Sequence, residues 1–375
     1  MCLVAESITF TRTEEQEMLG ATVREFLEAT VEMDSIRDAS LTDSAIDGDA
    51  WSGLAEMGLI GLHIPEEYGG AGYSFVETAI VFEELGRRVT PVPLLSSLLA
   101  SSAILAAGSD EQKARLLPQI VSGNRIATLA AFEHAHDLDR VDATADPVGN
   151  GWNLSGVKRY VTDAPNADVF VVVADTGTGI GLFMVDRSAT GVSATATPSL
   201  DATRPLGELT LKGVAVDADA YLGGSPSPGA VRVALDAGIV ALAQEQAAGI
   251  QRCLEMSVEY AKSRFQFGRA IGSFQAVKHM CADMLVAAEH ARSAASHAAR
   301  TLDDPQESPV SIPLARSVCS DAYLKAAGDT IQIFGGIGFT WEHDAHLYLK
   351  RAKSTALLFG SVESNRDRLA DAIGI

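Results

Sequence analysis

One twelve-residue segment combines the side chains needed to hold a large anionic cofactor. Arg264-Phe-Gln-Phe-Gly-Arg-Ala-Ile-Gly-Ser-Phe-Gln275 contains a fixed cation, aromatic faces, glycines and an amide. The guanidinium of Arg264 can offer paired donors to a pyrophosphate, and Phe267 and Phe274 could pack beside a ring. An alternative for Arg264 is that it only caps the dipole of a helix end. The segment indicates a flavin-binding element.

A second segment, Gln332-Ile-Phe-Gly-Gly-Ile-Gly-Phe-Thr-Trp341, follows further along the chain. Its glycines remove side chains where a backbone must approach a ligand closely, although a glycine-rich turn alone often only ends a helix. The two segments, occurring in this order, resemble the acyl-CoA dehydrogenase family. The resemblance covers nearly the whole chain.

The resemblance implies that FAD is held across a subunit boundary by three groups of residues. Arg264, Phe267 and Gln275 would contact the FAD of a neighbouring subunit. Gln332, Gly335 and Gly336 correspond to residues that hold the adenosine-pyrophosphate part. Tyr160 and Thr162 match the strand that meets the flavin ring, so Thr162 is the candidate for a hydrogen bond near flavin N5.

The base that such an enzyme needs is missing from its usual places. The family removes a proton from Cα of an acyl-CoA thioester with a carboxylate, while a hydride passes from Cβ to flavin N5. Proton removal of this kind requires a well-placed, desolvated base. Matching the family's usual segment places Phe359 at the glutamate position, and Gly238 falls where some relatives carry the base instead. Neither side chain accepts a proton.

Glu245 is the remaining candidate for the base. It follows Gly238 by seven residues, which places the two on one helix face but about 10.5 Å apart along the axis. Its helical stretch carries little charge, so burial would raise its pKa, as suits a general base. Alternatively, a partner in the bundle satisfies this carboxylate. Glu363 is a weaker candidate because its helix is expected to be exposed.

Three functions follow from these residues. The first is an FAD-dependent acyl-CoA dehydrogenase that uses a displaced base, with an acyl-CoA substrate and an electron-transfer flavoprotein or similar acceptor. The second is a non-catalytic, FAD-supporting subunit that pairs with a related catalytic chain, as in bacterial relatives that form mixed tetramers. The third is a different flavin reaction, such as oxygenation, which no residue of the sequence specifically indicates. The segment Phe132-Glu-His-Ala-His-Asp137 departs from the family's usual loop, which leaves the orientation of the acyl-CoA open.

Composition excludes several other classes of protein. The net charge of -20 over 375 residues speaks against a nucleic-acid-binding face and against an anionic membrane surface. No apolar run approaches the roughly 20 residues of a membrane span, and no signal peptide is visible. Four cysteines without metal-ligand spacing are expected to be buried free thiols: Cys2, Cys253, Cys281 and Cys319. These features predict a cytoplasmic protein without a metal site.

The hydrophobic period divides the chain into three regions of an α+β fold. We expect a helical domain over 1–124, a small β-barrel or sandwich domain over 125–229, and a four-helix bundle over 230–375. Strands are expected near 152–162, 169–174, 181–185 and 207–211, and long helices near 235–265, 273–302 and 312–334. Ser109 and Gln112 predict a capping box at one helix start. This domain order is also that of the acyl-CoA dehydrogenase fold.

Overall fold

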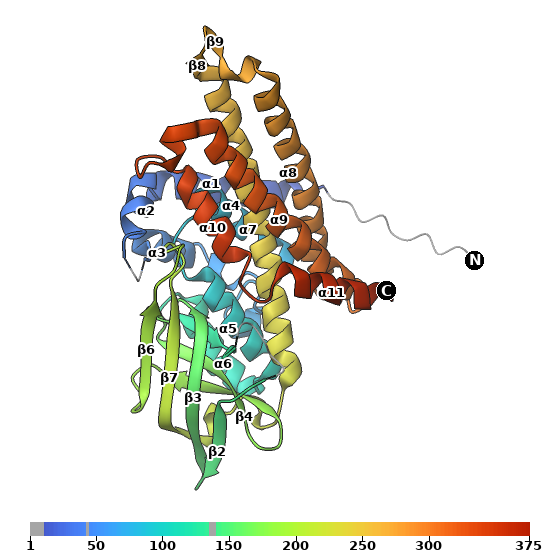
Figure 1. The fold of residues 1–375 in the computed structure, drawn as a ribbon. Helices are drawn as coiled ribbons and strands as arrows, with labels where there is room; N and C mark the ends of the chain where they lie inside the picture. The colour runs from blue at the N-terminus through green and yellow to red at the C-terminus, as the bar shows by residue number, and fades with distance from the viewer. Residues whose placement is uncertain (1–10, 43–44, 135–139) are drawn as a thin grey trace, which may run out of the picture.

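A computed structural model describes residues 11–42, 45–134 and 140–375 of the chain. Helices at the N-terminus are followed by a sheet and then by a second, longer set of helices (Figure 1). The expected three-part α+β fold is confirmed.

The N-terminal region is helical. Its helices are α1 (Glu14–Thr30), α2 (Met33–Ala39), α3 (Gly48–Glu56), α4 (Phe75–Arg88), α5 (Leu94–Ala107) and α6 (Asp110–Val121). The predicted capping box is present, because Gln112 N donates to Ser109 Oγ and Ser109 N donates to Gln112 Oε1. Helix α5 has no charged residue and is buried on nearly all sides, as expected of a helix enclosed by other elements.

The middle region forms a seven-stranded sheet. Its strands are β1 (Ala127–Ala130), β2 (Thr144–Val148), β3 (Gly151–Thr162), β4 (Val169–Asp175), β5 (Ile180–Asp186), β6 (Val192–Thr197) and β7 (Leu206–Asp217). The order is β1-β4-β2-β3-β7-β6, with β5 paired to β4. The pairing of Thr162 with Leu206 joins the end of β3 to the start of β7. This register fixes the connection before β7 beside Thr162.

The C-terminal region is built on three long helices: α7 (Pro228–Ser263), α8 (Gln275–Thr301) and α9 (Ser308–Phe334). Helix α7 begins earlier than expected, because Pro228 occupies the first helical turn, where proline is tolerated. The hairpin of β8 (Phe265–Gln266) and β9 (Arg269–Ala270) joins α7 to α8. Helices α10 (Ala345–Thr355) and α11 (Val362–Ile373) pack on α9. Short 3₁₀ helices lie at Leu59–Gly61, Glu66–Tyr68, Ala218–Ala220, Leu222–Gly224, Ile271–Ser273 and Gly335–Phe339.

The cysteines confirm the expectation in part. Cys253 and Cys319 are fully buried, and burial raises the pKa of each thiol to about 12. Cys281 is only half-buried, so the expectation is wrong for this residue. Cys2 lies outside the described residues. None of the helices in the described ranges is both long and apolar enough to cross a membrane.

Close packing of α7 on α9 gives a first testable prediction. A Cβ built on Gly249 would lie 2.4 Å from Cζ of the buried Tyr323 ring. Because the ring must move, Gly249→Ala should lower the free energy of unfolding by about 1–3 kcal/mol. Gly328→Ala on α9, where a Cβ would meet nothing within 4 Å, should instead stabilise by up to about 1 kcal/mol. Chemical denaturation of both variants measures the difference, and equal effects would contradict the packing described.

Candidate flavin and substrate site

The segment that follows α7 forms a projecting hairpin. Arg264 is the C-cap of α7, with its backbone N–H donating to Tyr260 O. Phe267 and Gly268 occupy the turn with φ of 53° and 78°, which is the pattern of a tight two-residue hairpin turn. The Phe267 side chain is 91% exposed, and the Arg269 guanidinium lies 4.1 Å from the centre of the Phe274 ring. The hairpin therefore presents aromatic faces and guanidinium groups to the outside.

The glycine segment at the end of α9 is open to a ligand. Gly335 ends the helix with φ of 62° and ψ of -136°, a conformation that strongly favours glycine. A Cβ built on Gly335 or Gly336 would meet nothing within 4 Å, and Gln332 is exposed one turn earlier. Space for a closely approaching group is therefore present along this backbone.

Tyr160 and Thr162, the strand residues expected near the flavin ring, lie on β3, away from the hairpin that follows α7. Thr162 is buried at the end of β3, where Thr128 Oγ1 donates to Thr162 O at 2.7 Å. Tyr160 is exposed and has a φ of 55°. The hairpin and β3 lie toward opposite ends of the molecule (Figure 1). A single chain does not bring the two sets of candidate flavin residues together.

The two usual base positions face each other. A Cβ built on Gly238 would lie 3.0 Å from Phe359 Cε2 and 2.7 Å from Leu99 Cδ2. Phe359 is 8% exposed and takes a φ of 59°, on the turn after α10. The two positions assigned by sequence therefore converge in space, where α5, α7 and this turn make an apolar contact.

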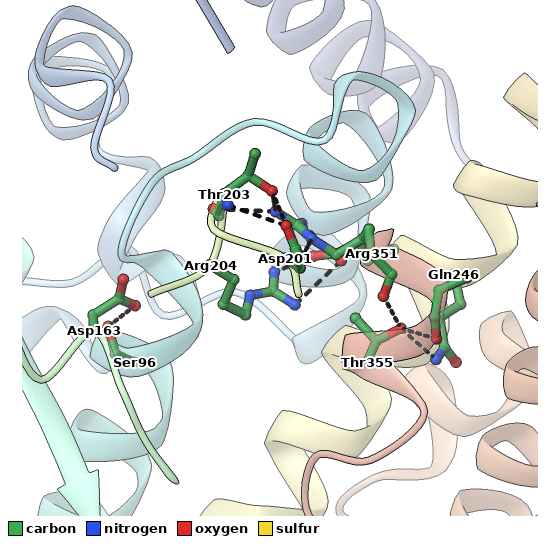
Figure 2. Close-up of polar contacts among 10 residues, drawn as sticks. Ser96, Asp163, Asp201, Thr203, Arg204, Gln246, Arg351 and Thr355 are labelled. Carbon is green, nitrogen blue, oxygen red and sulfur yellow. Dashed lines mark hydrogen bonds and ion pairs between the residues drawn. The ribbon is translucent and has the colours of Figure 1, made fainter. Parts of the chain in front are cut away.

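Glu245 is held in a buried cluster of four charged side chains. Figure 2 shows the other three members, Asp201, Arg204 and Arg351. Its Oε1 accepts from Arg204 at 3.2 Å and from Arg351 at 3.0 Å, and its Oε2 accepts from Arg204. Arg351 also donates to Asp201 Oδ2 at 2.6 Å and to Thr203 Oγ1 at 2.7 Å. The cluster joins α7 and α10 to the connection between β6 and β7.

The expectation of a raised pKa at Glu245 is wrong. Burial alone would raise it, but the adjacent charges of Arg204 and Arg351 and their hydrogen bonds lower the pKa below its ordinary value. The carboxylate is thus kept ionised with both oxygens occupied, which matches the alternative of a carboxylate satisfied by partners. Glu363 lies in the first turn of α11, where hydrogen bonds from its own backbone and from Ser361 lower its pKa. The geometry favours neither as a base poised for proton transfer.

Asp163, next to Thr162 in the chain, is a carboxyl whose pKa is raised, whereas that of Glu245 is lowered. Asp163 is buried and accepts a hydrogen bond from Ser96 Oγ at 2.8 Å (Figure 2). Burial raises its pKa to about 6, against the lowering effects of Ser96 and of the more distant Arg204 and Arg351. The folded state therefore binds this proton more tightly than the unfolded chain does.

Replacing Asp163 should consequently stabilise the protein at neutral pH. A raised carboxyl pKa costs stability as pH rises from about 3.8 to about 6. Asp163→Asn, which can still accept from Ser96 and tolerates the φ of 52°, should add about 1–3 kcal/mol at pH 7 and little below pH 4. Unfolding measured against pH tests this, with exposed Asp146→Asn as control. A variant that is less stable than wild type at pH 7 would contradict the assignment.

Several site residues were not predicted from the sequence. Asp201, Arg204 and Arg351 complete the cluster around Glu245, and the buried Arg316 contacts the turn that carries Phe359. Glu133, in the loop that departs from the family, pairs with the fully buried Lys158 of β3. Residues 135–137 of that loop lie outside the described residues. An arginine within an otherwise apolar helical stretch was the available signal for Arg316.

Comparison with known proteins assigns the class. Three family models match in order: the acyl-CoA dehydrogenase N-terminal domain over residues 13–124, the middle domain over 133–214 and the C-terminal domain over 229–374. Acyl-CoA dehydrogenase IpdE2 of Mycobacterium tuberculosis is 35% identical over 97% of this chain and 98% of its own. The chain therefore belongs to the acyl-CoA dehydrogenase family, whose members are flavoprotein oxidoreductases.

Several solved structures have the same fold over nearly the whole chain. The ChsE4-ChsE5 complex from Mycobacterium tuberculosis matches with a TM-score of 0.90 and 29% identity, covering 98% of this chain and 99% of that one. The Tcur3481-Tcur3483 steroid ACAD matches with a TM-score of 0.87 and 33% identity, covering 96% and 98%. A glutaryl-coenzyme A dehydrogenase complex matches with a TM-score of 0.92 and 27% identity, covering 98% and 97%.

Proposed function

We propose that this chain takes part in the FAD-dependent α,β-dehydrogenation of an acyl-CoA thioester. The observation that carries the proposal is the match of all three domains of one dehydrogenase family along the chain. When bound, FAD would supply the hydride acceptor for this reaction. An acyl-CoA is the proposed substrate, an electron-transfer flavoprotein or similar protein the proposed acceptor, and lipid metabolism the proposed setting.

The residues present fit FAD. Arg264 would pair with the pyrophosphate, and Gln332 with the open backbone at Gly335 and Gly336 would hold the adenosine side. The Thr162 hydroxyl would lie near flavin N5, and Tyr160 near the ring. The remaining proposed contacts are Phe267, Phe274 and Gln275.

The separation of these residues supports an oligomer. Because the hairpin and β3 lie far apart in one chain, one FAD would be shared between the hairpin of one subunit and the β domain of another. A homo- or hetero-oligomer arranged as a dimer of dimers would bring the hairpin of one subunit and the β domain of another to the same FAD. The exposed Phe267 and Phe339 would then be covered.

A second candidate function is an FAD-supporting subunit that has no base of its own. It is favoured by the contact of Phe359 with Gly238 and by the ion pairs that occupy Glu245. Two similar structures are of paired chains, ChsE4-ChsE5 and Tcur3481-Tcur3483. In such an assembly the flavin-holding residues of this chain would help to bind the shared FAD, and a related chain would provide the carboxylate that removes the proton.

Purification of the chain alone and with a related chain tests the proposal. Each preparation is loaded with FAD, and the flavin absorbance is followed during addition of a panel of acyl-CoA thioesters. Bleaching in either preparation is the expected result. If no preparation binds FAD, or if no acyl-CoA bleaches bound flavin, the proposed function is wrong.

A further inference from the structure

A buried guanidinium lies directly against the turn that carries Phe359. Arg316, on α9, is fully buried. It donates to Leu358 O at 2.6 Å, to Gly360 O at 3.3 Å and to Ser320 Oγ at 3.0 Å. Two of these acceptors are the carbonyls of the residues on either side of Phe359. The cation therefore lies close to the backbone of the usual base position.

The charge of Arg316 lacks a counter-ion among the residues that the structure describes. None of the ion pairs found there includes Arg316, and its Nε–H is buried without an acceptor. Arg351 is equally buried but pairs with two carboxylates, Glu245 and Asp201. Burial lowers the pKa of Arg316 to about 10, because an unpaired buried charge is costly.

Hydrogen bonds tie this cation to the charged cluster. Ser320 Oγ donates to Gln246 Oε1 at 3.2 Å, and Gln246 Nε2 donates to Thr355 Oγ1 at 3.0 Å (Figure 2). The hydroxyl of Thr355 in turn donates to Arg351 O at 2.8 Å. Side chains from α7, α9 and α10 thus connect the turn at 358–360 to the cluster beside the β domain.

We propose that Arg316 is a positioning residue, which fixes the turn at 358–360 and would serve as the counter-ion of a carboxylate at position 359. In this chain position 359 is a phenylalanine, so the turn itself supplies no negative charge to Arg316. This inference rests on the proposed function, since that function gives position 359 its meaning.

Few other ionisable groups face Arg316. Cys319, on the same helix, is a buried thiol with a pKa raised to about 12. Tyr323, one turn further, is also buried, and burial raises its pKa well above the ordinary value. Gln246 of α7 and Thr355 of α10 are linked to Arg316 only through Ser320, and neither titrates. The pair of Asp321 with Arg366 of α11 is exposed. A carboxylate introduced at 359 would therefore respond mainly to Arg316.

A pH titration of stability tests the proposal without substrate. Phe359→Glu and Phe359→Gln are compared as full-length chains, each with Arg316 intact and with Arg316→Met. With Arg316 intact, the introduced carboxylate should have a pKa below about 4.3, so Phe359→Glu gains stability over Phe359→Gln as pH rises through that range. Arg316→Met should raise this pKa by about 1–3 units, and the sign of the pH dependence should reverse.

The same sign in both backgrounds would overturn the proposal. If Arg316→Met does not fold, the slope with Arg316 intact decides, because a carboxylate that titrates above its ordinary range contradicts a counter-ion role. Arg316→Lys keeps the charge and should keep the slope, and its loss would also contradict the proposal. Since neither FAD nor acyl-CoA is used, this result is independent of whether flavin binding and bleaching succeed.

Discussion

Glu245→Gln lowers the free energy of unfolding by about 3–5 kcal/mol, because it leaves Arg204 and Arg351 buried with too little negative charge. The lowered pKa of Glu245 gives the effect a defined pH dependence. The stability that the carboxylate provides is fully present above its unfolded-state value of about 4.5 and is lost as pH falls through the lower folded-state value. Denaturant unfolding at several pH values measures both quantities.

An exposed ion pair provides the control for this variant. Glu289 pairs with Arg292 on the outer face of α8, so Glu289→Gln should change stability by no more than about 0.5 kcal/mol. If Glu245→Gln were as stable as wild type and only lost flavin reduction, Glu245 would be a base and not a structural anion.

Arg264→Ala should weaken FAD binding by about 10- to 100-fold in the assembled protein. Removing charge-assisted hydrogen bonds to a pyrophosphate costs about 1.5–3 kcal/mol, and each 1.4 kcal/mol is tenfold in affinity. Fluorescence titration of the apoprotein with FAD measures the change. The folded state should be preserved, because Arg264 lies outside the helix and is exposed.

The matched control is Arg292→Ala, which removes an exposed arginine of α8 from a surface pair with Glu289. Its FAD affinity should equal that of wild type. Unchanged affinity in Arg264→Ala would instead mean that Arg264 only caps the end of α7, and the pyrophosphate contact would have to be assigned elsewhere.

Long elements were predictable from the sequence. The three long helices of the bundle are rich in alanine and other helix-forming residues, strands β3, β4, β5 and β7 have alternating or continuous apolar residues, and the capping box at Ser109 gave a helix start directly. Strands β1, β2 and β6 were not expected, because they are short. Pairing with longer neighbours, which no local pattern reveals, stabilises them.

The candidate site also has a part that local motifs indicated and a part that only the tertiary structure reveals. Local motifs indicated the hairpin at Arg264 and the glycines after Gln332. The environment of Glu245 could not be predicted, because Asp201, Arg204 and Arg351 come from distant parts of the chain. Desolvation was anticipated correctly, but its effect on the pKa was reversed by two arginines that only the fold brings near. The contact of Gly238 with Phe359 likewise depends on tertiary structure.

The most direct test of the account is the rate of flavin reduction by an acyl-CoA, measured by rapid mixing. The FAD-loaded chain alone is compared with its complex with a related chain that carries a glutamate at the family's base position. Since a general base contributes about 10²- to 10⁴-fold, the chain alone should reduce its flavin slower by about that factor. Reduction at equal rates in the two preparations would contradict the claim that this chain has a flavin site without its own base.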